Sequence, residues 1–500
     1  QQDDSYPIQS IVDHVHVKSK FPILKPWVAR DLVQSKYRAI YDLEAQRKTI
    51  GRFLEIGIFK FANIELEVRD SSLLIQHLYL TPSDPMAYSA EAEVNNRSGG
   101  FLGTKATLSF QHNNIFRGAE RYKVSGSGGV EFQFVPDQSP INTYQFSLNN
   151  TFEFPRILMP FNVINEINGN LPRTVISNQF DFQRRVGFFT GYAADLRYGF
   201  RWRGTVYNFF EAFPIVINYQ LYGNRTPEFE QLIRNDTRLE QSFENTLLLT
   251  NYFAYIFDNQ SRAPINDNVY AKFSIETAGN IANLILGGSA DNNNTKDILG
   301  VNYSQFVKGT IDARKYFNLP FGHIATRLII GAGKAIGNST EIPYNKQFSI
   351  GGSNSLRAFP LRSLGPGRYV PDPLENEVVQ LIDQTGDIKL EGNVEYRFPI
   401  WGWFEGAAFI DAGNIWLTDS DSRPDGVFKF SEFYKEIAVG PGLGIRLDAE
   451  YVVLRLDVGV PVRVPVFKDN FKWRFDKLNA FSGEFWTERV NYTFGLGYPF

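Results

Sequence analysis

The sequence predicts an all-β transmembrane barrel of sixteen antiparallel strands, preceded by a small N-terminal α+β domain. Three observations support this fold class. Many segments alternate large apolar residues with small or polar ones, aromatic residues make up 15% of the 500 residues, and no apolar run is long enough for a transmembrane helix. The mean hydropathy of only −0.25 fits strands that each expose one thin apolar face.

The last ten residues show this alternation most clearly. Because side chains on a strand point to opposite faces in turn, the large residues here share one face and the small or polar residues share the other. The large residues are Tyr492, Phe494, Leu496, Tyr498 and Phe500, and the opposite face includes Gly495, Gly497 and Pro499. A soluble edge strand would alternate similarly, but a strand that closes on a C-terminal Phe resembles the signal by which outer-membrane barrels are recognised for insertion.

The barrel is expected over residues 86–500, because sixteen alternating segments follow one another there and bacterial barrels have an even number of strands. A tight turn at 318–322 and another at 448–450 alternate with long polar loops at 336–385 and 461–488. Short turns at one rim and long loops at the other are typical of outer-membrane barrels, whose turns lie in the periplasm. The expected strands are 87–96, 103–112, 120–134, 142–154, 174–186, 190–203, 212–222, 244–258, 267–279, 302–317, 323–335, 386–398, 405–417, 435–448, 450–460 and 489–500.

Residues 1–85 do not continue the pattern and are expected to form a separate domain with the order β-α-α-β-β. Asp42 can cap a helix that ends at Gly57, since Asp is favoured before the first turn and Gly after the last. The other expected elements are a strand at 11–17, a helix at 27–33 and strands at 61–68 and 73–80.

Composition excludes several classes of function. The chain has no Cys, which removes disulfides, thiolate metal sites and Cys nucleophiles, and its five His show no zinc-ligand spacing. A net charge of −3 argues against nucleic-acid binding. No Gly-x-Ser-x-Gly elbow is present, so we expect no enzyme, cofactor or metal. The start at Gln1 carries no signal-peptide pattern, which indicates a processed chain or a fragment.

Two further segments are expected outside the strands. Residues 224–243 predict a short amphipathic helix in an extracellular loop. Residues 155–161 are apolar, and they fit either an interface helix or an ordinary turn at the rim.

Two short segments carry a resemblance to a known family. Residues 49–59 lead through a Gly-x-Phe turn into a strand, and residues 113–118 read Asn-Asn-Ile-Phe-Arg-Gly. The first segment resembles a POTRA (polypeptide-transport-associated) domain. The second resembles the first periplasmic turn of the BamA/TamA family of outer-membrane assembly proteins. The resemblance covers essentially the whole chain, and it implies that residues 1–85 form a POTRA-like domain in the periplasm of a Gram-negative bacterium.

The longest loop, 336–385, carries the most specific motif. Its Gly351-Gly-Ser-Asn-Ser-Leu-Arg-Ala-Phe359 segment resembles the Arg-Gly-Phe motif of the family's sixth extracellular loop, with Ala358 in place of the usual Gly. The resemblance implies that this loop folds into the lumen. Arg357 and Phe359 would then anchor it, with Glu395 and Asp411 as the lumen-facing carboxylates that hold the arginine. An arginine guanidinium offers five N–H donors in a fork that suits carboxylates. The alternative is that Arg357 lies in solvent and that both carboxylates merely line a water-filled lumen.

Segments at 363–367, 397–399 and 435–440 further resemble TamA-like members of Bacteroidetes type. The family resemblance implies non-enzymatic insertion, assembly or translocation of outer-membrane proteins. Unfolded outer-membrane proteins would be the clients, and the bilayer with its lipopolysaccharide would surround the barrel. The POTRA-like domain would bind clients or a periplasmic or inner-membrane partner.

The last strand is expected to pair weakly with the first. Gly495, Gly497 and Pro499 lie just before Phe500, and Gly and Pro weaken a strand ladder. A labile seam between these strands could open laterally, although the same residues would also suit a short terminal strand at the rim. The alternative function is a passive outer-membrane pore, since sixteen strands can enclose an aqueous lumen.

Overall fold

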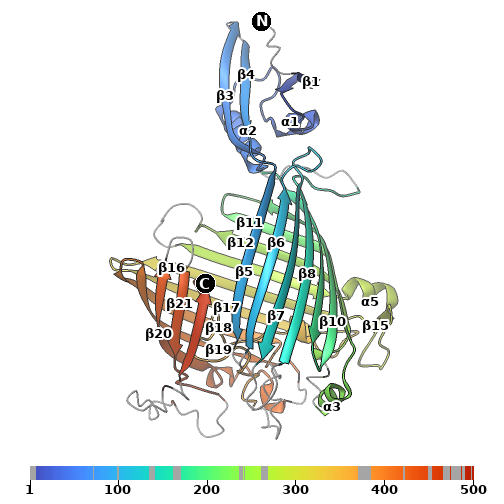
Figure 1. Cartoon of the computed structure of the whole chain (residues 1–500), viewed down its shortest axis with the longest axis vertical. Helices are drawn as coiled ribbons and strands as arrows, with labels where there is room; N and C mark the ends of the chain where they lie inside the picture. The colour runs from blue at the N-terminus through green and yellow to red at the C-terminus, as the bar shows by residue number, and fades with distance from the viewer. Residues whose placement is uncertain are drawn as a thin grey trace.

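One sixteen-stranded antiparallel sheet dominates the computed structural model, which confirms the predicted barrel fold (Figure 1). The residues described are 7–70, 73–97, 101–133, 141–160, 170–235, 240, 242–260, 268–369, 384–419, 423–448, 453–465, 473, 486, 490–496 and 498–500. The strands are β5 Met86–Arg97, β6 Phe101–His112, β7 Arg121–Gln133, β8 Ile141–Phe154, β9 Arg173–Arg185, β10 Phe189–Arg203, β11 Asn208–Gly223, β12 Thr246–Asp258, β13 Val269–Ala278, β16 Phe306–Asn318, β17 His323–Ala335, β18 Ile388–Trp401, β19 Phe404–Trp416, β20 Ala438–Asp448, β21 Val453–Gly459 and β22 Asn491–Leu496.

Each strand pairs with the next strand of the sheet along the chain, so the sheet is an up-and-down meander. All sixteen predicted strands are present, and most boundaries move by only a few residues. The last strand differs, because β22 ends at Leu496 and does not continue to the C-terminus. Among the described residues no helix is long and apolar enough to cross a membrane.

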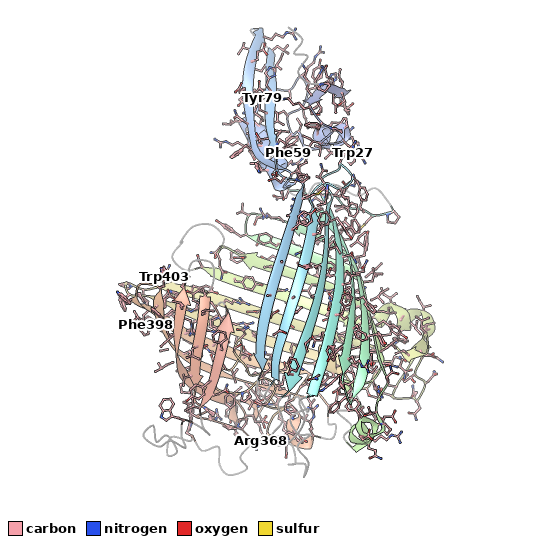
Figure 2. The ribbon with its side chains drawn as sticks, in the orientation of Figure 1. Trp27, Phe59, Tyr79, Arg368, Phe398 and Trp403 are labelled. Carbon is pink, nitrogen blue, oxygen red and sulfur yellow. The ribbon has the colours of Figure 1, made fainter. Side chains whose placement is uncertain are left out.

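The barrel wall separates two chemical environments. On β18 and β19 the outward Val394 and Ile410 are 50% and 55% exposed, whereas the inward Glu395 and Asp411 are completely buried. Leu443 and Phe494 continue the outward apolar surface, each 66% exposed. Trp403 is exposed at the barrel rim that lies nearer the N-terminal residues (Figure 2). The alternation seen in the sequence therefore places large apolar side chains outside and charges inside.

The N-terminal residues form a separate unit beyond one end of the barrel (Figure 1). Both predicted helices are present, and Asp42 caps the second by accepting a hydrogen bond from the Glu44 backbone at 2.8 Å. Gly57 follows that helix with a φ of +75°, as a C-terminal Gly often does. The elements are β1 Ile8–Val12, β2 Val15–Ser19, α1 Pro26–Leu32, α2 Leu43–Glu55, β3 Phe59–Asp70 and β4 Leu73–Pro82.

The order of this unit corrects one expectation. The single strand expected at 11–17 is a hairpin, because Asp13 and His14 adopt positive φ angles of 46° and 70° and reverse the chain. The order is therefore β-β-α-α-β-β, and β1–β2 and β3–β4 form separate two-stranded sheets. Non-Gly residues with positive φ are uncommon, so a turn at this position gave no clear sequence signal.

Specific contacts hold this unit against the barrel rim. The Lys25 backbone donates to the Arg117 carbonyl at 2.8 Å, within the turn after β6. Arg173, at the start of β9, donates to the Glu55 carbonyl at 2.9 Å. The Arg156 guanidinium lies 4.8 Å from the ring centre of Trp27, which Figure 2 labels at this junction. These contacts come from several turns of the rim, so they fix the orientation of the unit.

Candidate functional site in the barrel lumen

The loop between β17 and β18 folds back against the inner wall of the barrel. Its Ile350, Leu356 and Phe359 are at most 5% exposed. They pack with Ile415 of β19 and Ala438 of β20 in one apolar cluster. A long loop needs such anchoring to take one conformation, because ordering it costs backbone entropy.

Arg357 is the charged centre of this contact and is fully buried. Its Nε and Nη2 atoms donate to the two carboxylate oxygens of Asp411, each at 2.9 Å, and its backbone N–H donates to the same group at 3.0 Å. Nη1 donates to Glu395. The guanidinium carbon lies 3.4 Å from the ring centre of Phe409. The structure thus brings Arg357, Glu395 and Asp411 together in a bidentate, ring-stacked arrangement.

The register of β18 and β19 explains how two carboxylates reach one arginine. Asn393 lies opposite Asp411, and both point inward because side chains alternate along each strand. Asn393 Nδ2 donates to Asp411 Oδ1 at 2.9 Å and to the Ser355 carbonyl of the loop at 3.0 Å. The amide therefore orients Asp411 and also holds the loop.

The charged cluster contains more residues than the family motif implies. Arg446 donates to Asp457 at 2.6 Å and lies 3.3 Å from Glu395. Arg397 donates to Glu395 at 2.6 Å, and Arg455 Nε lies 3.3 Å from Asp457 Oδ2. The cluster comprises Arg357, Arg397, Arg446, Arg455, Glu395, Asp411 and Asp457, each at most 4% exposed. Charges on the small-residue faces of the last strands were the signal that could have identified the additional members.

The electrostatics of the cluster favour the charged form of Arg357. Burial alone would lower the pKa of the Arg357 guanidinium, but the hydrogen bond to Asp411 raises it, as do the charges of Asp411, Glu395 and Asp457. The net result is a pKa above the ordinary arginine value. A buried charge of this kind is tolerated because its partners are present, so loss of one partner would be costly.

Glycines on the inner wall make room for the loop. A Cβ atom at Gly440 would overlap the Cβ of Ala358, and one at Gly459 would lie 2.7 Å from the Cα of Ala358. A Cβ at Gly442 would overlap the Phe409 ring that stacks on Arg357. The close approach of the loop thus depends on missing side chains in β20 and β21.

The last strand also contacts the loop. Asn491 Nδ2, at the start of β22, donates to the Arg357 carbonyl at 2.7 Å. Arg455 of β21 donates to the Ser353 carbonyl at 2.9 Å and to Asn354 Oδ1 at 2.8 Å. At the far end of the loop, Arg368 pairs with Glu436 at 3.0 Å near the rim opposite the N-terminal unit (Figure 2). The loop is therefore bonded to several strands of the C-terminal half of the barrel.

The chain end departs from the expected strand. Tyr492 and Phe494 point outward, 54% and 66% exposed, as predicted. Phe500, however, is buried and does not share their face. The Arg397 guanidinium lies 4.5 Å from the Tyr498 ring centre and 5.6 Å from that of Phe500. Burial beside a lumen-facing arginine accounts for this inward turn.

The remaining predicted seam residues have different positions. Gly495 lies in β22, where a Cβ atom would lie 2.5 Å from the Arg455 guanidinium. Pro499 is buried next to Phe500, beyond the end of the strand. Gly497 and the side chain of Leu496 lie outside the described residues.

The hydrogen-bonded order of the large sheet begins at β22 and ends at β5. Within the described parts of the two strands, no backbone ladder joins them. β22 has six residues, whereas β5 has twelve. A ladder between them could therefore satisfy at most half of the free edge of β5.

Two other expectations concern the loops. The amphipathic helix expected within 224–243 is present as α3 Pro227–Asn235. The described residues 155–160 contain no helix, so this stretch is an ordinary turn. Over the described ranges, no group of three or more His, Asp and Glu residues is placed to hold a metal ion.

Comparison with known proteins agrees with this architecture. Residues 101–498 match the model of the Omp85 superfamily domain. The chain is similar to the crystal structure of BamA from Haemophilus ducreyi lacking POTRA domains 1–3, with a TM-score of 0.59 and 13% identity over 88% of this chain and 79% of that one. It is also similar to CdiB from Acinetobacter baumannii, with a TM-score of 0.51 and 11% identity over 90% of this chain and 70% of that one.

At these identities the structural likeness establishes the fold alone, but the superfamily match covers most of the barrel. It agrees with the outward apolar surface, the alternating short turns and long loops, and the folded-in loop. The chain therefore belongs to the Omp85 superfamily and is an outer-membrane β-barrel protein of the class that assembles or translocates proteins.

Proposed function

We propose that this protein inserts or translocates outer-membrane proteins through a labile seam between β5 and β22. The unequal lengths of these strands and the absence of a described ladder between them carry the proposal. Unpaired backbone groups at such an edge can pair with a strand of an incoming client. The BamA/TamA resemblance supports the same function, and the motifs at 363–367 and 435–440 favour a TamA-like member.

Arg357, Phe359, Glu395 and Asp411 would act as the loop anchor in this mechanism. By fastening the loop to β18 and β19, they would keep the C-terminal half of the wall rigid while β22 and β5 separate to admit a client strand. The Asn491 contact with the Arg357 carbonyl supports a direct link between loop and seam. Tyr492 and Phe494 would face lipid beside the seam and contribute, with Phe500, to a C-terminal insertion signal.

Residues 1–85 would form a POTRA-like periplasmic domain that binds clients or a periplasmic or inner-membrane partner. β3 and β4 pair only with each other within the described residues, so each offers a free edge for strand addition. The bonds between this unit and the barrel rim would keep those edges directed away from the wall.

Disulfide locking tests the seam. The chain has no Cys, so each variant carries only the introduced thiols. Cysteines at Tyr88, Ala90 or Ala92 of β5 would be combined one at a time with a cysteine at Tyr492 or Phe494 of β22. After oxidation of the pairs that cross-link, we expect client-barrel insertion into vesicles to fall to the level without protein and to recover on reduction. Complete cross-linking with unchanged insertion would refute the opening of the seam.

Each locked pair needs its two single-cysteine variants as controls, treated with the same oxidant.

A large, steady single-channel conductance in planar bilayers would instead favour the passive pore. We expect only small or transient conductance, because the loop occupies the lumen. Depletion in the source bacterium followed by an outer-membrane proteome should show loss of a narrow set of barrels for a TamA-like member and global loss for a core assembly subunit.

A further inference from the structure

The helix α5 Asn280–Leu286 displays its apolar face outward. It lies in the loop between β13 and β16, at the rim opposite the N-terminal unit. Leu284 is 87% exposed and Ile285 77% exposed, and Ile281 and Leu286 are also exposed. Leu299, in the turn between β14 Asp297–Ile298 and β15 Val301–Asn302, adds a fifth exposed aliphatic residue at 81%. We call these five residues the α5 apolar face.

The polar side of α5 is fastened to the barrel. Gln305 Nε2 donates to Asn280 Oδ1 at 3.0 Å. The Tyr303 hydroxyl lies 3.1 Å from Asn283 Oδ1 and 2.7 Å from the Gly287 carbonyl. Tyr303 and Gln305 are themselves buried, and Asn338 donates to the Tyr303 carbonyl at 2.9 Å. The outward orientation is therefore set by buried hydrogen bonds and is not a property of a loose loop.

A second helix at the same rim shows the usual arrangement. α3 buries Phe229 and Ile233 against Phe189 and Phe243, and its charged residues face outward. α5 has the opposite arrangement, and residues 279–290 contain no Asp, Glu, Lys or Arg. A helix directed into water would be expected to resemble α3.

The surroundings of α5 indicate what covers its apolar face. Phe273 and Ile275 of the preceding strand β13, and Val307 and Ile311 of the following strand β16, are exposed on the outer wall. Figure 1 shows α5 beside the barrel wall, whereas α3 lies at the end of the barrel. The α5 apolar face therefore continues the lipid-facing surface, and a helix can enter lipid because it satisfies its own backbone hydrogen bonds.

We propose that the α5 apolar face is immersed at the boundary between acyl chains and headgroups of the surrounding leaflet. Only the choice of leaflet rests on the proposed function, because the leaflet is the outer one when the N-terminal unit is periplasmic. β16 and β13 are the seventh and eighth of sixteen strands counted from β22. The α5 apolar face therefore lies across the barrel from the seam. It fixes the depth of the barrel on that side and leaves the β5–β22 side free to deform the bilayer.

Depth-dependent quenching tests this placement. The full-length chain, with one cysteine at Leu284 and a bimane label, would be reconstituted in phosphatidylcholine vesicles with or without brominated acyl chains. Phe273→Cys is the lipid-facing reference, and Glu228→Cys on the exposed side of α3 is the aqueous reference. We expect bromine quenching at Leu284 within about twofold of that at Phe273, with iodide quenching severalfold below that at Glu228.

Leu284 is nearly fully exposed, so its replacement removes no packing, and Ile285→Cys provides an independent repeat. Iodide quenching at both positions equal to that at Glu228 would place α5 in water and overturn the proposal. Protection from iodide without bromine quenching would indicate that a second copy covers the face, and would also overturn it. Loss of bromine quenching at Phe273 as well would refute the membrane placement of the whole barrel, whereas loss at α5 alone leaves the proposed function intact.

Discussion

The two halves of the barrel wall are stabilised differently. In the C-terminal half, strands β17 to β22 are bonded through the lumen by the loop, with charged pairs that join several strands at once. In the N-terminal half, the inward polar residues of β7 to β9 bond mainly to their neighbours on the next strand. Ser147 donates to Asp181 at 2.5 Å, and Asn149 Nδ2 donates to Gln179 Oε1 at 3.3 Å.

This difference shows where deformation of the barrel is least costly. Bonds between adjacent strands restrain only one pair, whereas the cluster around Arg357 restrains β18, β19, β20 and β21 together through the loop. The free edges of β5 and β22 lie where the locally bonded half meets the loop-bonded half. A boundary between a compliant and a rigid wall is a suitable place for a seam.

The largest expected effect comes from removing the centre of the cluster. Arg357→Ala leaves Glu395, Asp411 and Asp457 as buried carboxylates with fewer partners. We expect a loss of about 3–5 kcal/mol in the free energy of unfolding, the range for a broken buried pair. Thermal unfolding in detergent and proteolysis within residues 336–369 of the loop measure it, and this part of the loop should become cleavable.

Arg357→Lys is the matched control, because it keeps the charge but loses the bidentate fork. It should fall between the natural protein and Arg357→Ala. An Arg357→Ala variant with unchanged melting temperature and a protected loop would show that the apolar contacts of the loop suffice. The contrast between the two halves would then rest on packing and not on charge.

The chain end gives the second effect. Phe500→Ala removes a buried ring at the end of the loop-bonded half, and we expect a loss of about 3 kcal/mol, near the lower end for a buried Phe. Phe494→Ala is the control, since its side chain is 66% exposed on the outer wall and should change detergent stability little. A larger loss from Phe494→Ala than from Phe500→Ala would contradict the inward position of the C-terminus.

The sequence predicted all sixteen strands because alternation is local and each strand carries its own signal. It did not predict the turn at Asp13 and His14, where neither residue is Gly. The burial of Phe500 depends on Arg397, more than a hundred positions earlier in the chain. The partners of Arg357 on β18 and β19 were expected from the family motif, whereas Arg446 and Asp457 depend on strand register, which no single segment encodes.

The glycines of the inner wall provide a test of packing between loop and wall. Gly440→Ala places a methyl group where the Cβ of Ala358 lies, and overpacking of this kind costs about 1–3 kcal/mol. Adding Ala358→Gly should restore most of that loss, since the clash then disappears. Gly392→Ala, whose added Cβ meets nothing within 4 Å, is the matched control and should have little effect. Additive losses in the double variant would place Ala358 away from β20.

The smallest effect is expected in the other half of the wall. Asn150, on the outer face of β8, bonds side chains of the two adjacent strands within the part of the chain that the structure describes, at 3.0 Å from the Tyr122 hydroxyl and 3.0 Å from Asn178. Asn150→Ala should therefore lower the free energy of unfolding by about 0.5–1.5 kcal/mol, the usual value of one hydrogen bond, without changing proteolysis of the loop. A loss as large as that of Arg357→Ala, or cleavage of the loop, would show that the two halves are coupled through the sheet. The seam would then not separate a rigid wall from a compliant one, and the lability of β22 would have to come from its short length alone.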